Sequence, residues 1–162
     1  MLFVATALIT TTTSCDDDDD EMMEEEMEME MEAEGVVVWS GDTVTFTKAD
    51  GANPADEANQ DRITDNVWIT RGNTGGQIYN AVEETSSDKE ESPSGTLWAV
   101  GTTADIENLE FTMFRTAVDK PKDAVGIDLV MLLVQDSIAL DLKITSWSQG
   151  PSGGFAYERS SE

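Results

Sequence analysis

The sequence predicts an all-β fold, an antiparallel β-sandwich of jelly-roll type, with a β-barrel as the alternative. The first observation is a hairpin pattern at residues 126–148, where an apolar run is followed by a polar turn and then by alternating apolar and polar residues. The second is a series of short apolar or alternating segments separated by Gly- and Asp-rich turns. The third is that no long amphipathic helix pattern occurs in the sequence. Together these features are typical of short strands packed in two layers.

The hairpin pattern at residues 126–148 is the predicted centre of the fold. Residues 127–134 are apolar on both faces of an extended strand, so we expect this strand inside a sheet with both faces covered. Residues 138–145 alternate, which predicts one buried face and one solvated face.

The other predicted elements are short. Residues 36–39 and 43–47 form either a hairpin or one bulged strand. A helical turn is expected at 54–59, where Pro54 can begin it, and a second at 114–118. The polar stretch 83–95 has no periodicity and predicts a surface loop. The remaining strands are expected at 66–71, 77–82, 96–101, 109–113 and 155–159.

Composition excludes several classes of function. The chain of 162 residues has 34 acidic and 9 basic residues and a net charge of -25. Residues 16–34 hold 13 of the acids and no base, which leaves 21 acids against 9 bases, or -12, for residues 35–162. With so few bases we expect no basic patch of the kind that nucleic-acid binding needs.

The chain has one cysteine and no histidine. An intrachain disulfide, a Cys/His metal site and a Ser-His or Cys-His nucleophile are therefore excluded. We expect a protein that is not an enzyme, and any catalysis would rest on carboxylates or a tyrosine.

The N-terminus predicts export. Residues 2–9 are apolar but too few to span a bilayer, and small or polar residues then lead to Cys15. This arrangement resembles a bacterial lipoprotein signal peptide at residues 1–14, although no basic residue precedes the apolar run and Thr12 stands where leucine is usual. The resemblance implies lipidation of Cys15 and anchoring of the protein in the bacterial envelope. An ordinary secretory signal and a buried structural cysteine are the alternatives.

Residues 15–34 combine the cysteine with a low-complexity acidic arm that is rich in Met and Glu. Like charges repel, so we expect a disordered tether that holds the domain away from the membrane. A surface-export signal is a second interpretation. Metal binding is a third, with Cu(I) on the methionine sulfurs or Ca²⁺ on the carboxylates.

Two groups of residues within the domain at 35–162 have the composition of a glycan-binding site, because an aromatic ring can stack on a sugar while polar groups bind its hydroxyls. They are Trp68 with Asp65 and Arg71, and Trp147 with Tyr157 and Glu158. The alternative is that the tryptophans pack in the core or at its rim and that the arginines pair with carboxylates.

Asp136 and Asp141 flank the turn and second strand of the central hairpin. Carboxylate oxygens are ligands that Ca²⁺ prefers, so calcium is the candidate cofactor. The alternative for Asp136 is a hydrogen bond to the backbone of its own turn.

Four stretches of the domain resemble an uncharacterised domain of exported proteins from marine Bacteroidetes and related bacteria. They are residues 44–51, 59–72, 143–148 and 153–159. The resemblance extends over almost all of 39–159 and implies export and exposure at the cell surface, but it implies no activity and no catalytic residue.

The sequence therefore predicts a lipid-anchored envelope protein that acts as a glycan-binding or adhesion module. A structural surface protein without a small-molecule ligand is the second hypothesis, and a carboxylate-based hydrolase is the third. The expected partners are the membrane, through lipid on Cys15, and a glycan.

Overall fold

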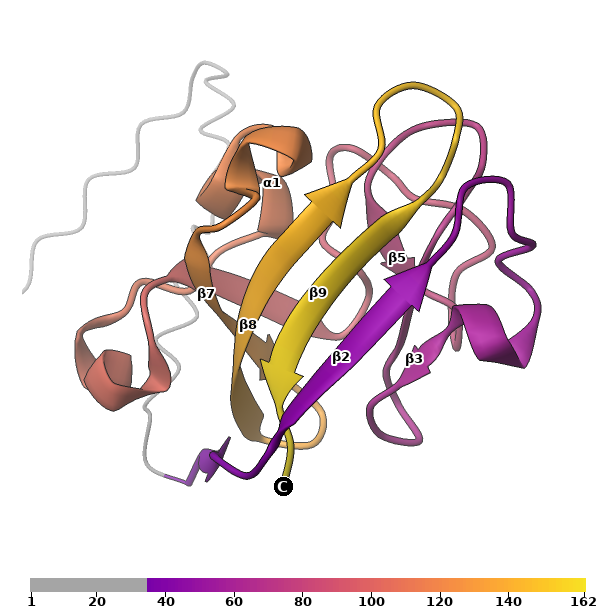
Figure 1. The fold of residues 1–162 in the computed structure, drawn as a ribbon. Helices are drawn as coiled ribbons and strands as arrows, with labels where there is room; N and C mark the ends of the chain where they lie inside the picture. Colours follow the sequence, from indigo (N-terminus) through magenta and orange to yellow (C-terminus); the bar gives the residue numbers. More distant parts are fainter. Residues whose placement is uncertain (1–34) are drawn as a thin grey trace, which may run out of the picture. The chain divides into compact units, whose positions relative to one another are not determined.

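The computed structural model describes residues 35–162, which form nine strands in two sheets (Figure 1). The predicted signal peptide, Cys15 and the acidic tether lie outside the described residues. Both apolar clusters described below lie within residues 35–162. No helix among these residues has the length and apolar character to cross a membrane.

The larger sheet has six strands. Four of them follow one another in the chain as an antiparallel meander from β6 to β9, and β2 adds to the free side of β9. Short β1 pairs in parallel with the first residues of β8. Their bounds are β1 Val37–Trp39, β2 Thr43–Lys48, β6 Thr96–Val100, β7 Asp128–Leu133, β8 Ile138–Trp147 and β9 Phe155–Ser160.

The smaller sheet has three antiparallel strands in the order β3-β4-β5. The two sheets share no strand, and within the described residues the path of the larger sheet ends at β2 and β6. The predicted all-β sandwich is confirmed, and the barrel alternative is wrong. The strands are β3 Asp61–Arg62, β4 Trp68–Arg71 and β5 Ile78–Asn80, and the helical turns are η1 Glu57–Asn59, η2 Thr103–Asn108, α1 Phe114–Val118 and η3 Pro121–Ala124.

The central hairpin is formed by β7 and β8, as predicted. β7 is covered on both faces because successive side chains point to opposite sides of the sheet. Leu129, Met131 and Leu133 join the cluster between the sheets, whereas Val130 and Leu132 join a second cluster on the other face. That second face is covered by partly buried side chains from Val36, Leu97, Ile106, Leu109 and Phe111.

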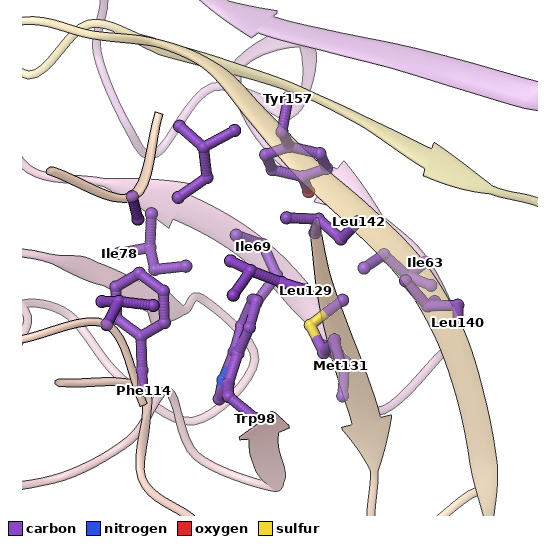
Figure 2. Close-up of a cluster of buried hydrophobic side chains, with 14 of the residues drawn as sticks. Ile63, Ile69, Ile78, Trp98, Phe114, Leu129, Met131, Leu140, Leu142 and Tyr157 are labelled. Carbon is purple, nitrogen blue, oxygen red and sulfur yellow. The ribbon is translucent and has the colours of Figure 1, made fainter. Parts of the chain in front are cut away.

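The main core lies between the sheets (Figure 2). Ile69 and Ile78 of the smaller sheet belong to the same cluster as Trp98, which is fully buried and lies 4.7 Å from Phe114 between ring centroids. Burying one such side chain contributes about 1.5–3 kcal/mol. The predicted helical turn at 114–118 forms α1, and its Phe114 completes this packing.

Two local predictions are corrected. Residues 36–47 do not form a hairpin, because β1 pairs with β8 and β2 pairs with β9, so both run in the same direction. The chain crosses between them at Gly41, where a Cβ atom would lie 2.2 Å from the carbonyl oxygen of Glu162. Residues 109–113 form a single bridge between Thr112 and Trp98 rather than a strand, since the chain turns into α1 directly afterwards.

Candidate ligand-binding cavity

Arg71, the last residue of β4, is only 2% exposed and reaches into the connection between β8 and β9. Its Nη1 donates to the carbonyl oxygens of Ser148 at 2.9 Å and Gly154 at 2.8 Å. Its Nε donates to the carbonyl oxygen of Gly76 at 3.3 Å. The guanidinium therefore joins the β4–β5 connection to the β8–β9 connection.

The same guanidinium lies over Trp147, the last residue of β8, with its Cζ 4.0 Å from the ring centroid. Trp147 is half-buried and packs against Phe155 at 6.0 Å between centroids. A cation over an indole face is a favourable electrostatic contact. Arg71 occupies that face of Trp147, so a ligand has access only to the part of the indole that remains exposed.

A second buried cation lies near Arg71. Lys48 ends β2, is 1% exposed, and donates from Nζ to Asn73 Oδ1 at 2.9 Å and to the Gly153 carbonyl oxygen at 3.3 Å. Within residues 35–162, neither Lys48 nor Arg71 has a carboxylate oxygen within 4.0 Å. Both cations are held by neutral oxygens.

The pKa values of Lys48 and Arg71 are both shifted by their burial and by neighbouring charges. Burial lowers the pKa of Lys48, the neighbouring charge of Arg71 lowers it further, and Asp50 opposes both effects. Burial also lowers the pKa of Arg71, again against the charge of Asp50. The net shift is downward for both groups, and burial is its largest cause.

A cavity of about 570 Å³ opens beside Arg71 and Trp147. Among the described residues its wall contains no acidic side chain, and it contains five of the nine basic residues of the chain. The wall also contains Thr74, Gln149 and Pro151. The five basic residues are Arg71, Lys89, Arg115, Lys120 and Lys122.

Only two of these cations have a carboxylate near them within residues 35–162. Lys120 lies 3.9 Å from Asp119, and Lys122 lies 3.3 Å from Asp123. All four side chains of these pairs are about half exposed or more, so the pairs are worth little and leave the ammonium groups accessible.

The first predicted group, Trp68 with Asp65 and Arg71, is not brought together. Trp68 and Arg71 are three residues apart on one strand and point to opposite faces. Trp68 donates from its indole N–H to the Thr64 carbonyl oxygen at 3.0 Å and lies under Arg62, whose Cζ is 4.1 Å from the ring. Asp65 is exposed on the preceding loop.

The second predicted group is also divided. Trp147 lines the cavity, whereas Tyr157 is 1% exposed in the core and Glu158 is exposed on the opposite face of β9. Successive residues of a strand face opposite ways, so Tyr157 and Glu158 cannot share one site. The structure instead combines Arg71 of the first group with Trp147 of the second.

Tyr157 donates to a buried ion pair, formed by Arg159 and Asp61, that joins the two sheets. Its hydroxyl donates to Asp61 Oδ2 at 2.7 Å, and Arg159 donates from Nε to Oδ2 at 2.7 Å and from Nη2 to Oδ1 at 3.0 Å. Burial acts to lower the pKa of Arg159, but the hydrogen bond and charge of Asp61 outweigh it and raise the pKa. Burial, and then the charge of Asp61, raise the pKa of Tyr157 well above its usual value.

The two predicted calcium ligands, Asp136 and Asp141, accept hydrogen bonds from different parts of the chain. Asp136 accepts hydrogen bonds from Thr64 Oγ1 and Asn66 Nδ2, both at 2.7 Å, and so connects the hairpin turn to the smaller sheet. Asp141 accepts from Thr103, from its backbone N–H at 2.7 Å and its hydroxyl at 2.9 Å. Asp136 lies in the turn before β8 and Asp141 lies within β8, and the two carboxylates share no hydrogen-bond partner, so they do not form one ligand set. The residues 35–162 contain no group of three or more metal-ligating side chains.

A smaller hollow of about 340 Å³ lies on the outer face of β8 and β9. Asp128, Asp141 and Glu158 line it with Lys143, and this is where a carboxylate-based hydrolase would place its acids. Asp128 is paired with Lys143 at 2.7 Å, and Asp141 is bonded to Thr103 as described above. Two of the three carboxylates therefore already have partners.

Sequence reasoning missed four of the five cations around the cavity: Lys89, Arg115, Lys120 and Lys122. One usable signal was present, because three bases fall within residues 115–122 of a chain that is otherwise strongly acidic. No spacing pattern connects that segment to Arg71 or Trp147, since only the packing of the loops brings them to one cavity.

No family model, curated protein or solved structure matches this chain. The geometry defines a β-sandwich protein with a basic, tryptophan-edged cavity at one end, and function is inferred from that cavity.

Proposed function

We propose that this protein is a lipid-anchored module of the bacterial envelope that binds glycans. The observation that carries the proposal is the cavity between the β8–β9 connection and the loops after β4 and α1, which places a half-buried indole beside polar side chains. Its volume of about 570 Å³ falls within the range of about 300–1,000 Å³ that is typical of ligand pockets. The exposed part of Trp147 offers an apolar surface to sugar C–H groups, and Gln149 and Thr74 offer hydrogen bonds to hydroxyls.

Glycan binding is tested by a glycan array and polysaccharide pull-down with the full chain, while tryptophan fluorescence is followed. We expect saturable binding that Trp147→Ala abolishes and that Gln149→Ala weakens, since both side chains line the cavity. Trp68→Ala is the matched control, because Trp68 lies under Arg62 on the other face of β4. Running the screen with Ca²⁺ and with EDTA shows whether a metal takes part. Binding that depends on Trp68 and not on Trp147 would place the ligand elsewhere and contradict the proposal for this cavity.

The anchoring part of the proposal rests on the sequence pattern of residues 1–15. Lipidation at Cys15 adds two or more acyl chains, which gives stable membrane attachment where one chain does not. Mass spectrometry of the mature N-terminus, with and without globomycin treatment of the cells, tests it. An unmodified Cys15 would rule out the anchor without affecting the glycan-binding proposal.

A structural surface protein without a small-molecule ligand is the second candidate. It is favoured by the tryptophans, since Trp98 is fully buried in the core and the other three are half-buried rather than arranged in an exposed line. Absence of binding to every glycan in the screen, with or without Ca²⁺, supports this candidate.

A further inference from the structure

Positive charge is concentrated in one place on an acidic domain. Residues 35–162 hold 21 acids and 9 bases, yet five of those bases line one cavity whose wall has no acid among the described residues. The rest of the domain therefore has 21 acids against four bases. A cavity of one sign surrounded by the opposite sign focuses the field on its interior and attracts ligands of the complementary charge.

The positive charge of the cavity is built into its floor. Arg71 is buried, and three of its N–H groups donate to backbone carbonyl oxygens, which do not cancel its charge. Lys48 behind it is held in the same way by an amide and a carbonyl oxygen. Because these charges are partly removed from water, they act more strongly on a bound anion than exposed lysines do.

The loops that form the floor are closely packed. Gly153 has φ of +75°, and a Cβ there would lie 2.1 Å from Asn73 Oδ1 and 2.8 Å from the Gly72 carbonyl oxygen. Asp50 accepts the Gly154 backbone N–H at 3.1 Å, and Asn73 donates to the Ala52 carbonyl oxygen at 2.9 Å. The connection between β8 and β9 is thus held against the loops after β2 and β4. A preformed floor reduces the ordering cost of binding a ligand.

We propose that the cavity selects anionic polysaccharides and binds a sulfate or carboxylate substituent of a sugar ring. Arg115, Lys120 and Lys122 contact the charged substituent, while Trp147 and Gln149 contact the sugar itself. The proposal rests on the glycan-binding function above and specifies its ligand class. Duplex nucleic acid is the less favoured polyanion, because its backbone would have to lie along the acidic surface that surrounds the cavity.

The ligand class is tested with the full chain and a matched set of polysaccharides. Dextran and dextran sulfate differ only in sulfate, and a polyuronate supplies carboxylates. We expect dextran sulfate or the polyuronate to bind at least about tenfold more tightly than dextran, which corresponds to about 1.4 kcal/mol. Raising the ionic strength from about 0.1 M to 1 M shortens the screening length from about 10 Å to 3 Å, so this preference should shrink. Preference for sulfate alone, carboxylate alone or both supports the proposal and identifies the charged group.

Variants distinguish binding in the cavity from general charge effects. Lys120→Gln together with Lys122→Gln is expected to weaken binding about tenfold, and Lys122→Gln alone about threefold. Lys143→Gln is the control with the same change of charge, since Lys143 lies on β8 outside the cavity wall and pairs with Asp128. We expect Lys143→Gln to change affinity less than twofold. All three positions are about half exposed, so the variants should remain folded, which their unfolding temperatures check.

Four results would overturn the inference. Equal binding of dextran and dextran sulfate, lost in Trp147→Ala, leaves the glycan-binding function standing and removes its anionic preference. Equal loss in Lys122→Gln and Lys143→Gln assigns the preference to general attraction rather than to this cavity. Tighter binding of duplex DNA than of any polysaccharide assigns the cavity to another polyanion. Absence of binding to every polysaccharide contradicts both this inference and the proposed function.

Discussion

The protein buries two arginines, and their surroundings differ. Arg159 on β9 forms a two-point ion pair with Asp61 of β3, and Tyr157 adds a third hydrogen bond to the same carboxylate. Arg71 on β4 is less exposed than Arg159, 2% against 8%, yet it bonds to carbonyl oxygens and has no carboxylate within 4.0 Å among residues 35–162. The pKa of Arg159 is raised by its partner, whereas the pKa of Arg71 is lowered by burial.

This difference in partners distinguishes Arg159, whose charge is neutralised within the fold, from Arg71, whose charge is not. Arg159 and Asp61 neutralise each other's charge and connect the two sheets. Their charged groups are therefore not available to a ligand. The Arg71 guanidinium is hydrogen-bonded, but its charge is not neutralised, and it lines the basic cavity of about 570 Å³. Burial alone therefore does not tell whether a charged residue serves the fold or a ligand; the charge of its partner does.

The largest expected change in the free energy of unfolding is at the ion pair between Arg159 and Asp61. Arg159→Met leaves the Asp61 carboxylate buried without its cation, which should lower the free energy of unfolding by about 3–5 kcal/mol in urea titration. Adding Asp61→Asn to that variant removes the unpaired charge, so the double variant should be more stable than Arg159→Met alone. A loss below about 1 kcal/mol in the single variant would show that the pair does not hold the sheets together.

A smaller effect is expected from the same substitution at the other arginine. Arg71→Met removes hydrogen bonds to the carbonyl oxygens of Ser148 and Gly154 but leaves no unpaired charge, so we expect a loss of about 2 kcal/mol by the same titration. Substitution by Met keeps most of the apolar stem against Trp147. If Arg71→Met cost as much as Arg159→Met, the distinction between the two arginines would fail.

The smallest effect is a pH dependence at Lys48. Its folded pKa is lowered from 10.5, so the folded state releases this proton at a lower pH than the unfolded state does. Between the two pKa values the unfolded state binds more protons, and stability from this group rises with pH until about 10.5. The difference in unfolding free energy between the natural chain and Lys48→Met should therefore increase as the pH is raised through this window.

The comparison with Lys48→Met also removes the opposite contribution of Tyr157. The folded pKa of Tyr157 lies well above 10.0, so its contribution to stability is complete below pH 10.0 and is lost as the pH rises above that value. Because both proteins contain Tyr157, this loss cancels in the difference. A flat difference across the window would contradict the lowered pKa of Lys48 in the folded state.

Helices and strands could be predicted where the pattern of apolar residues in the sequence matches the burial of those residues in the fold. The apolar run of β7 and the alternation of β8 determine their burial directly, and both strands were predicted, as was α1 at 114–118. Prediction failed at 36–47, where the strand partners are distant in sequence, and at 109–113, where the chain turns into α1 directly after a single bridge. Nothing in the local pattern shows that β1 pairs with β8 while β2 pairs with β9.

The site was less predictable for the same reason. Arg71 and Trp147 were both named from composition, but each was assigned to neighbours close in sequence, and the strand alternation separates those neighbours. The contact between Arg71 and Trp147 spans 76 positions and depends on how the loops pack. Residue type indicated which side chains can bind a sugar; the long-range arrangement decides which of them share a cavity.

The parallel pairing of β1 with β8 has a mechanical consequence. β1 begins beside Ile138, whereas Trp147 lies at the other end of β8, nine positions and about 30 Å away. A pull on Gly35 against a ligand held at Trp147 would act along the strands, so the hydrogen bonds between β1 and β8 would share the load in shear instead of opening one after another. An adhesion module loaded in this direction would resist force through the strand that first enters its sheet.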